Sequence, residues 1–224
     1  MRAVLFDFDG VLVNSEPLHY SALRDALLPE GVAIDQESYV SSFLAFDDRG
    51  AIRRALEHHG RAFDRERVER VALRKAQLFE EKMHEIPFFP GARALVRALE
   101  QEVPIAIASG ARSAEIETLL SAGGLRDAFT AVVGADQVGH GKPHPEPYLT
   151  AMARVAVAAK AEDLRPEECL VIEDSMPGIA AGLAAGMRVV AVTNSYPAAK
   201  LSAAQRVVAS LEELTVASLR ALFD

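Results

Sequence analysis

Several features that would narrow the function of this protein are scarce in its sequence. It has one cysteine, Cys169, and no tryptophan, and no apolar run approaches the length that crosses a membrane. A single cysteine allows no internal disulfide, which is typical of a reducing compartment, so we expect a cytoplasmic protein. We interpret Cys169, which begins the run CLVI, as a small buried residue. We also expect no signal peptide, because the acidic residue Asp7 comes so early.

Positive charge is also in short supply. Lys and Arg number 24 against 32 Asp and Glu, which gives a formal net charge of −8 at pH 7. Proteins that bind nucleic acids or anionic membranes normally present a basic face, so we expect neither as a partner. The net charge does not argue against a phosphorylated substrate, because a local cation reverses the local field. With 224 residues, 50% of them hydrophobic, the chain can bury one large core or two modest ones.

The chain contains two kinds of sequence pattern. Residues 3–8, AVLFDF, have the pattern of a buried strand, whereas residues 16–85 are helical and charge-rich without any strand-like run. The candidate helix caps in this second section are Asp35, Asp47 or Asp48, and Asp64. Beyond it, the apolar runs VPIAIAS, AVVGA, CLVIED and MRVVAVTN alternate with helical patterns. This alternation is typical of a parallel sheet with both faces covered.

We therefore predict an α/β fold in two domains. The core, residues 1–15 and 86–224, would hold a doubly wound, mostly parallel, Rossmann-like sheet, and residues 16–85 would form an inserted α-helical cap domain. Neither the cap nor the C-terminal tail has a clean heptad repeat, so we expect a monomer.

Polar side chains follow four of the predicted strands at the point where each strand ends. They are Asp7, Asp9 and Gly10; Ser109 and Gly110; Lys142; and Glu173, Asp174 and Ser175. In doubly wound sheets, ligands bind beyond the carboxyl ends of the strands. We therefore expect these residues to form one site.

The charges of this site favour one chemistry. Four carboxylates at one sheet edge repel one another unless a cation joins them, and Mg²⁺ prefers oxygen ligands, especially beside a phosphate. With Mg²⁺ present, Asp7 can stay ionised and attack phosphorus, which forms an aspartyl-phosphate. Asp9, two residues further on, is placed to protonate the leaving oxygen. Ser109, with the backbone N–H groups after it, and Lys142 can hold the phosphoryl oxygens.

Four segments of the chain, in order, resemble the motifs of the haloacid dehalogenase superfamily. They are FDFDGVLVNSEPLH, IASGA, GKPHPEPY and VIEDSMPGIAAGLAAGM. The branch they are most similar to contains β-phosphoglucomutase and small phosphate-ester phosphatases. The resemblance covers the whole predicted core, and the helical insertion corresponds in position and length to the small cap of that family. The dehalogenating branch lacks an acid at the position that corresponds to Asp9. The presence of Asp9 therefore favours phosphoryl transfer over carbon–halogen cleavage.

The resemblance also implies a role for each matching residue. Asp7 is the nucleophile and Asp9 the acid/base, whose carbonyl also binds Mg²⁺. Ser109 and Lys142 hold the phosphate, and Lys142 also steadies Asp7. Asp174 is a direct metal ligand, and Glu173 is either a ligand or a nearby carboxylate. In the cap, His19 corresponds to a histidine near the acid/base and Arg49 to a substrate contact over the active site.

Each of these residues has a simpler structural interpretation as well. Asp-Gly is a common turn pair, a serine that opens a helix is usually its N-cap, and Glu173-Asp174 can cap the helix that follows. His19 can be a partly buried histidine, and Arg49 a first-turn arginine. His140 and His144 have a spacing that suggests a zinc pair, but prolines beside them disfavour a helical presentation, so we predict a loop role for both.

The hypothesis that results is a Mg²⁺-dependent phosphatase. It would hydrolyse a small soluble phosphate ester, such as a sugar phosphate or a phosphoglycolate-like compound, through an aspartyl-phosphate. A sugar phosphomutase would use the same residues, since the partition between water and a reoriented sugar phosphate depends on closure of the cap. A non-catalytic binding protein on the same fold is a third hypothesis, but such a protein would have little need of a repulsive carboxylate cluster.

Overall fold

The computed structural model describes residues 1–44 and 46–224, which form two compact units. The first contains Met1–Asn14 and Pro87–Asp224, and the second contains Ser15–Ile86. We call them the core unit and the helical unit. The helical unit is inserted directly after the first strand of the core unit, and each unit buries a hydrophobic core of its own.

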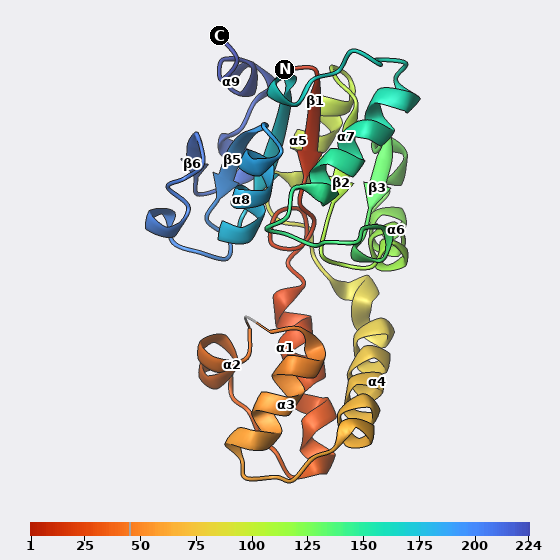
Figure 1. Ribbon diagram of the computed structural model, residues 1–224, viewed down its shortest axis with the longest axis vertical. Coiled ribbons are helices and arrows are strands. Elements are labelled where there is room, and N and C mark those ends of the chain that lie inside the picture. Colours follow the sequence, from red (N-terminus) through yellow and green to blue (C-terminus); the bar gives the residue numbers. More distant parts are fainter. Residues whose placement is uncertain (45) are drawn as a thin grey trace. The chain divides into compact units, whose positions relative to one another are not determined.

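The core unit is built on a six-stranded sheet (Figure 1). Its strands are β1 (Ala3–Phe6), β2 (Ile105–Ala108), β3 (Ala131–Val133), β4 (Cys169–Glu173), β5 (Arg188–Val192) and β6 (Arg206–Val208). All pairs are parallel, in the order β3-β2-β1-β4-β5-β6. The predicted α/β fold with a helical insertion is confirmed. The sequence pattern does not reveal β6, whose three residues, RVV, include only one buried residue, Val208.

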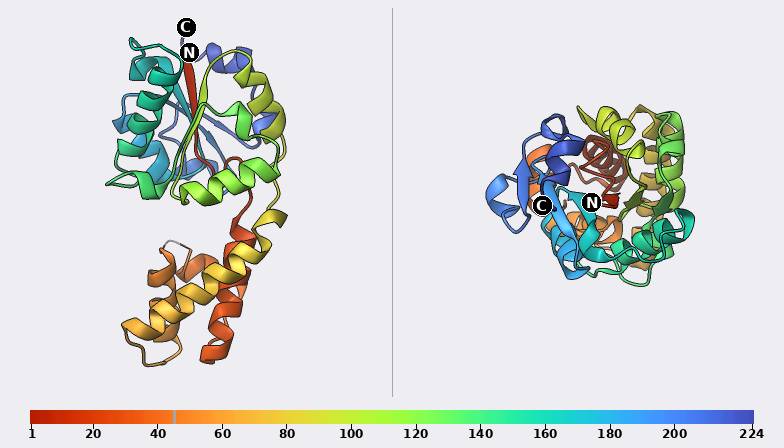
Figure 2. Two further views of the ribbon diagram at one scale, coloured as in Figure 1. Left: turned by 90° about the vertical axis from the view of Figure 1, so that its right-hand side faces the viewer. Right: turned by 90° about the horizontal axis from the view of Figure 1, so that it is seen from above.

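Helices cover both faces of this sheet. They are α5 (Ala92–Glu100), α6 (Ser113–Ala122), α7 (Glu146–Ala158), α8 (Met176–Ala184) and α9 (Val216–Arg220). In Figure 2, α7 and α8 lie on one face and α5 and α9 on the other. Tyr148 and Val155 of α7 and Ile179 of α8 pack in one apolar cluster with alternate residues of the strands. Strands covered in this way are buried on both faces, which explains their continuous apolar runs.

The strand order places a topological switch point at the carboxyl end of β1. Leu5 of β1 pairs with Ala106 of β2 on one side and with Val171 of β4 on the other. The chain connections diverge from β1 in opposite directions, which opens a crevice beyond the strand ends. The residues that follow β1, β2 and β4 therefore meet there.

The described residues of the helical unit form four α-helices: α1 (Glu16–Leu27), α2 (Gln36–Ser42), α3 (Asp48–His58) and α4 (Arg65–Lys82). The predicted N-caps of α2, α3 and α4 are confirmed as Asp35, Asp47 and Asp64, because each carboxylate accepts a bond from a first-turn backbone N–H. The apolar faces of the helices pack together in the core of this unit, which includes Leu27 of α1, Ile52 of α3 and Val71 of α4. Among the described residues, no helix combines the length and the apolar character that a membrane crossing requires.

Candidate active site

Asp7 lies directly beyond the end of β1, where the sheet still holds its backbone. Its N–H donates to the carbonyl of Ile172 in β4 at 2.9 Å, so its position is fixed by the sheet rather than by a loop. The residue is buried, with 8% of its surface exposed. Asp7 is thus a buried acid on a rigid element, which suits a group that must be held in a defined direction.

Lys142 connects Asp7 to Glu173. It comes from the loop between β3 and α7, and its Nζ lies 2.7 Å from Asp7 Oδ1 and 2.6 Å from Glu173 Oε1. Its ammonium also lies 4.9 Å from the centre of the Tyr148 ring. Burial opposes the charged form of Lys142, but the Asp7 and Glu173 carboxylates outweigh burial and raise the pKa of the ammonium. Lys142 therefore carries its charge inside the protein.

The carboxylate of Glu173 is fully occupied by protein donors. Oε1 accepts from Lys142 and from the Tyr148 hydroxyl at 2.8 Å, and Oε2 accepts from the N–H groups of Asp174 and Ser175 and from the Ser175 hydroxyl, at 2.9–3.0 Å. A carboxylate offers about four lone-pair directions, so these donors leave no free one. Burial opposes ionisation, yet Lys142 and the other donors lower the pKa of Glu173. Glu173 is thus an ionised anchor for Lys142 and the loop after β4.

Asp174 approaches the turn that follows Asp9. Its Oδ2 accepts a short hydrogen bond from the Ser195 hydroxyl, and a Cβ on Gly10 would lie 1.9 Å from that same oxygen. Gly10 also has a φ of 77°, in the left-handed region. The Gly10 carbonyl accepts from the Asn194 side chain at 2.7 Å. Only glycine allows this close approach, so Gly10 brings the loops after β1, β4 and β5 together.

Ser109 follows β2 and faces Asp9. Its backbone N–H donates to Val133 at 3.0 Å, which keeps it in the sheet, and its Oγ accepts from the N–H of Ala111 at 3.0 Å. The distance from Ser109 Oγ to Asp9 Oδ2 is 3.5 Å, longer than an ordinary O–H···O bond. Gly110 is exposed, with open space around its Cα. Asp9, Ser109 and Gly110 thus line a part of the crevice that is less tightly packed than the Lys142 cluster.

The Lys142 cluster, Asp7, Lys142, Glu173 and Asp174, carries an excess of negative charge. Burial raises the pKa of Asp7 well above its usual value, Lys142 opposes this, and the neighbouring Glu173 and Asp174 carboxylates add to it. Burial and the charge of Glu173 raise the pKa of Asp174 to about 7. One lysine faces three carboxylates here, so the cluster needs a further positive charge before all of its acids ionise at neutral pH.

These carboxylates have the chemistry of a metal site. Asp7, Glu173 and Asp174 each have a carboxylate oxygen within 4.8 Å of the others. An all-oxygen donor set suits a hard cation such as Mg²⁺. A divalent ion would neutralise the charge that Lys142 leaves uncompensated. The residues present thus fit a divalent cation. Both oxygens of Glu173 accept from protein donors, whereas Asp7 is paired through Oδ1 and Asp174 through Oδ2, so the latter two are the better candidates to hold it.

His19 and Arg49, the two site residues predicted outside the core, both belong to the helical unit. The Nδ1 of His19 accepts from Lys75 Nζ at 2.9 Å, and its ring stacks on Phe79 at 4.4 Å between centroids. Burial, and then the Lys75 charge, lower the pKa of His19 to about 3, so the ring is neutral with its proton on Nε2. His19 and Lys75 line a cavity of about 200 Å³ together with Asp48, which binds Lys75 at 2.8 Å.

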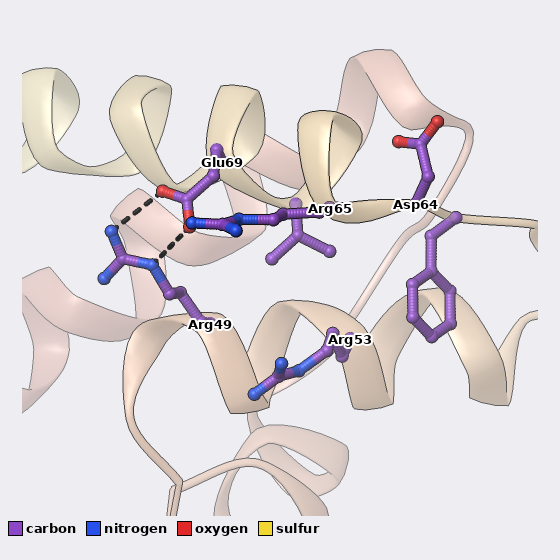
Figure 3. Close-up of a pocket in the computed structure, with 7 residues that line it drawn as sticks. Arg49, Arg53, Asp64, Arg65 and Glu69 are labelled. Atoms are coloured by element: carbon purple, nitrogen blue, oxygen red, sulfur yellow. Dashed lines mark hydrogen bonds and ion pairs between the residues drawn. The ribbon is translucent and has the colours of Figure 1, made fainter.

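Arg49 lies in a different hollow of the helical unit. Figure 3 shows its guanidinium turned toward Glu69 of α4, with Arg65 beside the same carboxylate. The ion pair is bidentate, with Nε and Nη2 at 2.7 and 2.8 Å from the two oxygens. Arg53, Arg65 and Phe63 also line this hollow, whose volume is about 310 Å³. The contacts of Arg49 and His19 with a substrate stay predictions.

Four side chains of these networks were not identified from the sequence: Asn194, Ser195, Tyr148 and Lys75. Ser195 and Asn194 follow β5, so the rule that found the other strand ends could have found them. Tyr148 lies on the apolar face of α7, where its hydroxyl has no sequence signal. Lys75 does have one: it shares its helix face with the buried residues Val68, Val71, Ala72 and Phe79 of α4. A lysine on an apolar stripe is a sign of a buried charge.

The chain is similar to known enzymes over most of its length. It is 32% identical to hexitol phosphatase B of Escherichia coli over 222 residues, which cover 97% of this chain and 96% of that one. It is 35% identical to the bifunctional riboflavin kinase/FMN phosphatase of Arabidopsis thaliana over 191 residues, 84% of this chain, and spans about half (48%) of that longer protein.

A solved structure shares the fold. CbbY from Rhodobacter sphaeroides in complex with phosphate is 27% identical and has a TM-score of 0.82, over 98% of this chain and 99% of that one. A family model described as haloacid dehalogenase-like hydrolase matches residues 1–186. The resemblance seen in the four motifs and the prediction of an enzyme are confirmed: the chain belongs to the haloacid dehalogenase-like hydrolases.

Proposed function

We propose that this protein is a Mg²⁺-dependent phosphatase that hydrolyses a small sugar-type phosphate ester through a phosphorylated Asp7. The observation that carries the proposal is the buried Lys142 cluster, in which one ammonium lies between Asp7 and Glu173 and leaves negative charge uncompensated. Such a cluster is poorly suited to a structural role, because unbalanced buried charge costs stability. It is suited to a site that a cation and an anionic substrate complete together.

In this proposal the core residues divide the work of phosphoryl transfer. Asp7 attacks phosphorus, and a bond forms between its carboxylate oxygen and the phosphorus atom as the bond to the alcohol oxygen breaks. Asp9 gives the departing oxygen its proton and then takes one from the water that hydrolyses the aspartyl-phosphate. Ser109, the backbone N–H of Gly110 and Lys142 hold the phosphoryl oxygens. Lys142 also keeps Asp7 oriented through the 2.7 Å contact.

A divalent cation would be held by Asp7, Asp174 and the backbone carbonyl of Asp9. When bound, it would neutralise charge on the phosphoryl oxygens and keep Asp7 ionised. We assign Glu173 to positioning, because protein donors occupy both of its oxygens. Glu173 would then hold Lys142 and the Asp174 backbone at the right places.

The substrate class is supported by the relatives. Hexitol phosphatase B matches this chain along nearly the whole length of both proteins, and CbbY was solved with phosphate. We therefore propose a sugar or sugar-alcohol phosphate as the substrate, with a phosphoglycolate-like ester as a further member of the test set. In the helical unit, the cavity lined by His19 and the hollow lined by Arg49 are the proposed sources of selectivity among substrates.

The test is phosphate release from a panel of phosphorylated sugars, sugar alcohols and 2-phosphoglycolate, with p-nitrophenyl phosphate as a general substrate. We expect turnover that needs Mg²⁺ and disappears after chelation, with Ca²⁺ a poor replacement because its coordination is larger and looser. The variant Asp7→Asn tests the nucleophile. Its matched control is Asp127→Asn, at an exposed carboxylate paired with Arg97. Full activity in rigorously metal-free protein would contradict the proposal.

The same panel separates hydrolysis from a phosphomutase reaction. A phosphatase releases inorganic phosphate in step with loss of the ester. A phosphomutase converts a sugar phosphate into its isomer with little release of inorganic phosphate. Phosphorus NMR of the reaction mixture distinguishes the two products directly.

A further inference from the structure

A second cluster of ligand-type side chains lies on the loop that carries Lys142. His140 and His144 flank that lysine, and Glu146 begins α7 directly after the loop (Figure 1). The Nδ1 atoms of His140 and His144 lie 2.9 and 3.8 Å from Glu146 Oε2, and the two rings are 4.7 Å apart between centroids. The predicted loop role for the two histidines did not take Glu146 into account, and the loop brings all three together.

The carboxylate of Glu146 is held in place by the loop itself. Its Oε1 accepts from the N–H of Gly139 at 2.6 Å, and its Oε2 accepts from the N–H of His140 at 3.0 Å. These backbone bonds and His140 lower the pKa of Glu146, so it is ionised. Pro143 and Pro145, on either side of His144, restrict the backbone further. These contacts hold the three side chains together, and a bound ion would replace two further hydrogen bonds, the one between His140 Nδ1 and Glu146 Oε2 at 2.9 Å and the one that the Glu146 N–H donates to His144 Nδ1 at 3.2 Å.

The donor set and spacing match a transition metal. In a tetrahedral zinc site, metal–ligand bonds of about 2.0–2.1 Å place neighbouring donors about 3.3 Å apart. The measured distances of 2.9 and 3.8 Å lie on either side of this value, and the three donor atoms are all within 4.8 Å of one another. The side chains of His140 and His144 are 72% and 51% exposed, so an ion can reach them from solvent.

We propose that His140, His144 and Glu146 bind a late first-row divalent metal ion of the Zn²⁺, Ni²⁺ or Cu²⁺ class, at a site separate from the buried carboxylates. Two imidazoles and one carboxylate favour these ions over Mg²⁺, whereas the Asp7 group offers only oxygens. Water completes the coordination. The bound ion would join the two ends of the loop that presents Lys142, so the site also clamps that loop. The binding itself does not depend on the proposed phosphatase activity.

The test is isothermal titration of the full-length protein with Zn²⁺, carried out with Mg²⁺ in large excess so that oxygen-only sites are filled. We expect one equivalent of saturable Zn²⁺ binding, weakened at least about tenfold by His140→Ala or His144→Ala and retained in Asp174→Asn. Co²⁺ gives an independent readout, because a nitrogen-containing site changes its visible absorption. The titrations do not require turnover, so they succeed or fail separately from the phosphatase assay.

His58→Ala/His59→Ala is the matched control. These are also neighbouring histidines, with rings 5.3 Å apart, but among the described residues they belong to no group that offers three metal-ligand atoms together. This double variant should bind Zn²⁺ as the unmodified protein does. The proposal would be overturned by an absence of saturable binding, by equal binding in His140→Ala/His144→Ala, or by loss of binding in Asp174→Asn.

Discussion

Among the described residues, each unit has one largely enclosed lysine, and the two lysines have different surroundings: the Lys142 side chain is 12% exposed and that of Lys75 is 5% exposed. Lys142 of the core unit lies between two buried carboxylates, those of Asp7 and Glu173. Lys75 of the helical unit lies between a neutral histidine, His19, and Asp48, whose side chain is 49% exposed. One lysine thus sits in a surplus of buried negative charge, whereas the other is matched by a single carboxylate.

This difference separates a cluster with uncompensated negative charge from a balanced pair. In the core unit, Lys142 cannot neutralise Asp7, Glu173 and Asp174 together, and the pKa values of Asp7 and Asp174 are raised as a result of burial and of their mutual repulsion. In the helical unit, burial and then the Lys75 charge lower the pKa of His19 and keep it neutral, and Asp48 balances the charge of Lys75. A buried lysine alone is therefore weak evidence of chemistry, and the net charge around it is the stronger evidence.

Replacing Asp7 by Asn should have the largest effect. The variant keeps the size of the side chain but removes the attacking charge, so kcat on p-nitrophenyl phosphate should fall by about a thousandfold or more. Steady-state assays on freshly purified protein, with mass spectrometry to confirm that the asparagine has not deamidated, provide the measurement. An Asp7→Asn enzyme that retains most of its turnover would rule out a covalent aspartyl-phosphate.

The contrast between the lysines is tested by the same substitution in both. Lys142→Met removes a donor to the phosphoryl oxygens and to Asp7, so kcat/KM should fall by about a hundredfold on aryl and alkyl phosphates alike. Lys75→Met should change turnover of the aryl phosphate by less than about threefold. Circular dichroism checks that both variants fold. Equal losses in the two variants would mean that the comparison between the units is wrong.

Much of the core site could be predicted, because the order and direction of the strands determine which residues meet there. Parallel strands end at one edge, so Asp7, Ser109, Lys142 and Asp174 could be placed together from their positions after strands. The contacts that depend on side-chain packing were beyond reach. The Tyr148 hydroxyl reaches Glu173 only because α7 packs over the sheet, and Lys75 is buried only because its helix face turns inward. In the helical unit no comparable rule locates the site residues, so His19 and Arg49 rest on resemblance.

Arg49 offers a smaller and more selective test. If this residue contacts the substrate, Arg49→Ala should lower kcat/KM for the best sugar phosphate by about tenfold and leave p-nitrophenyl phosphate nearly unchanged. The control is Glu69→Gln, which removes only the partner of the bidentate ion pair. If both variants change the substrate ranking equally, Arg49 acts by holding α3 against α4 rather than by binding the substrate.

The smallest expected effect concerns the proton on His19. In an unfolded chain a histidine has a pKa of about 6.5, whereas burial and Lys75 lower the pKa of His19 to about 3 in the folded protein. Between these values the unfolded state binds a proton that the folded state does not, so the stability contributed by a neutral His19 is complete above about pH 6.5. It is lost as the pH falls toward 3, at no more than about 1.4 kcal/mol per pH unit.

NMR titration of the histidine ring protons measures this directly. The signals of His19 should stay those of a neutral ring at pH 5. In Lys75→Met, where a nearby positive charge and the donor to Nδ1 are removed, the pKa of His19 should move upward, although burial should still hold it below 6.5. The free energy of unfolding of His19→Gln should also fall less than that of the unmodified protein between pH 7 and pH 5. A His19 pKa near 6.5 in the unmodified protein would show that Lys75 and His19 do not form the buried pair, and the helical unit would then lack the balanced lysine that sets it apart from the core.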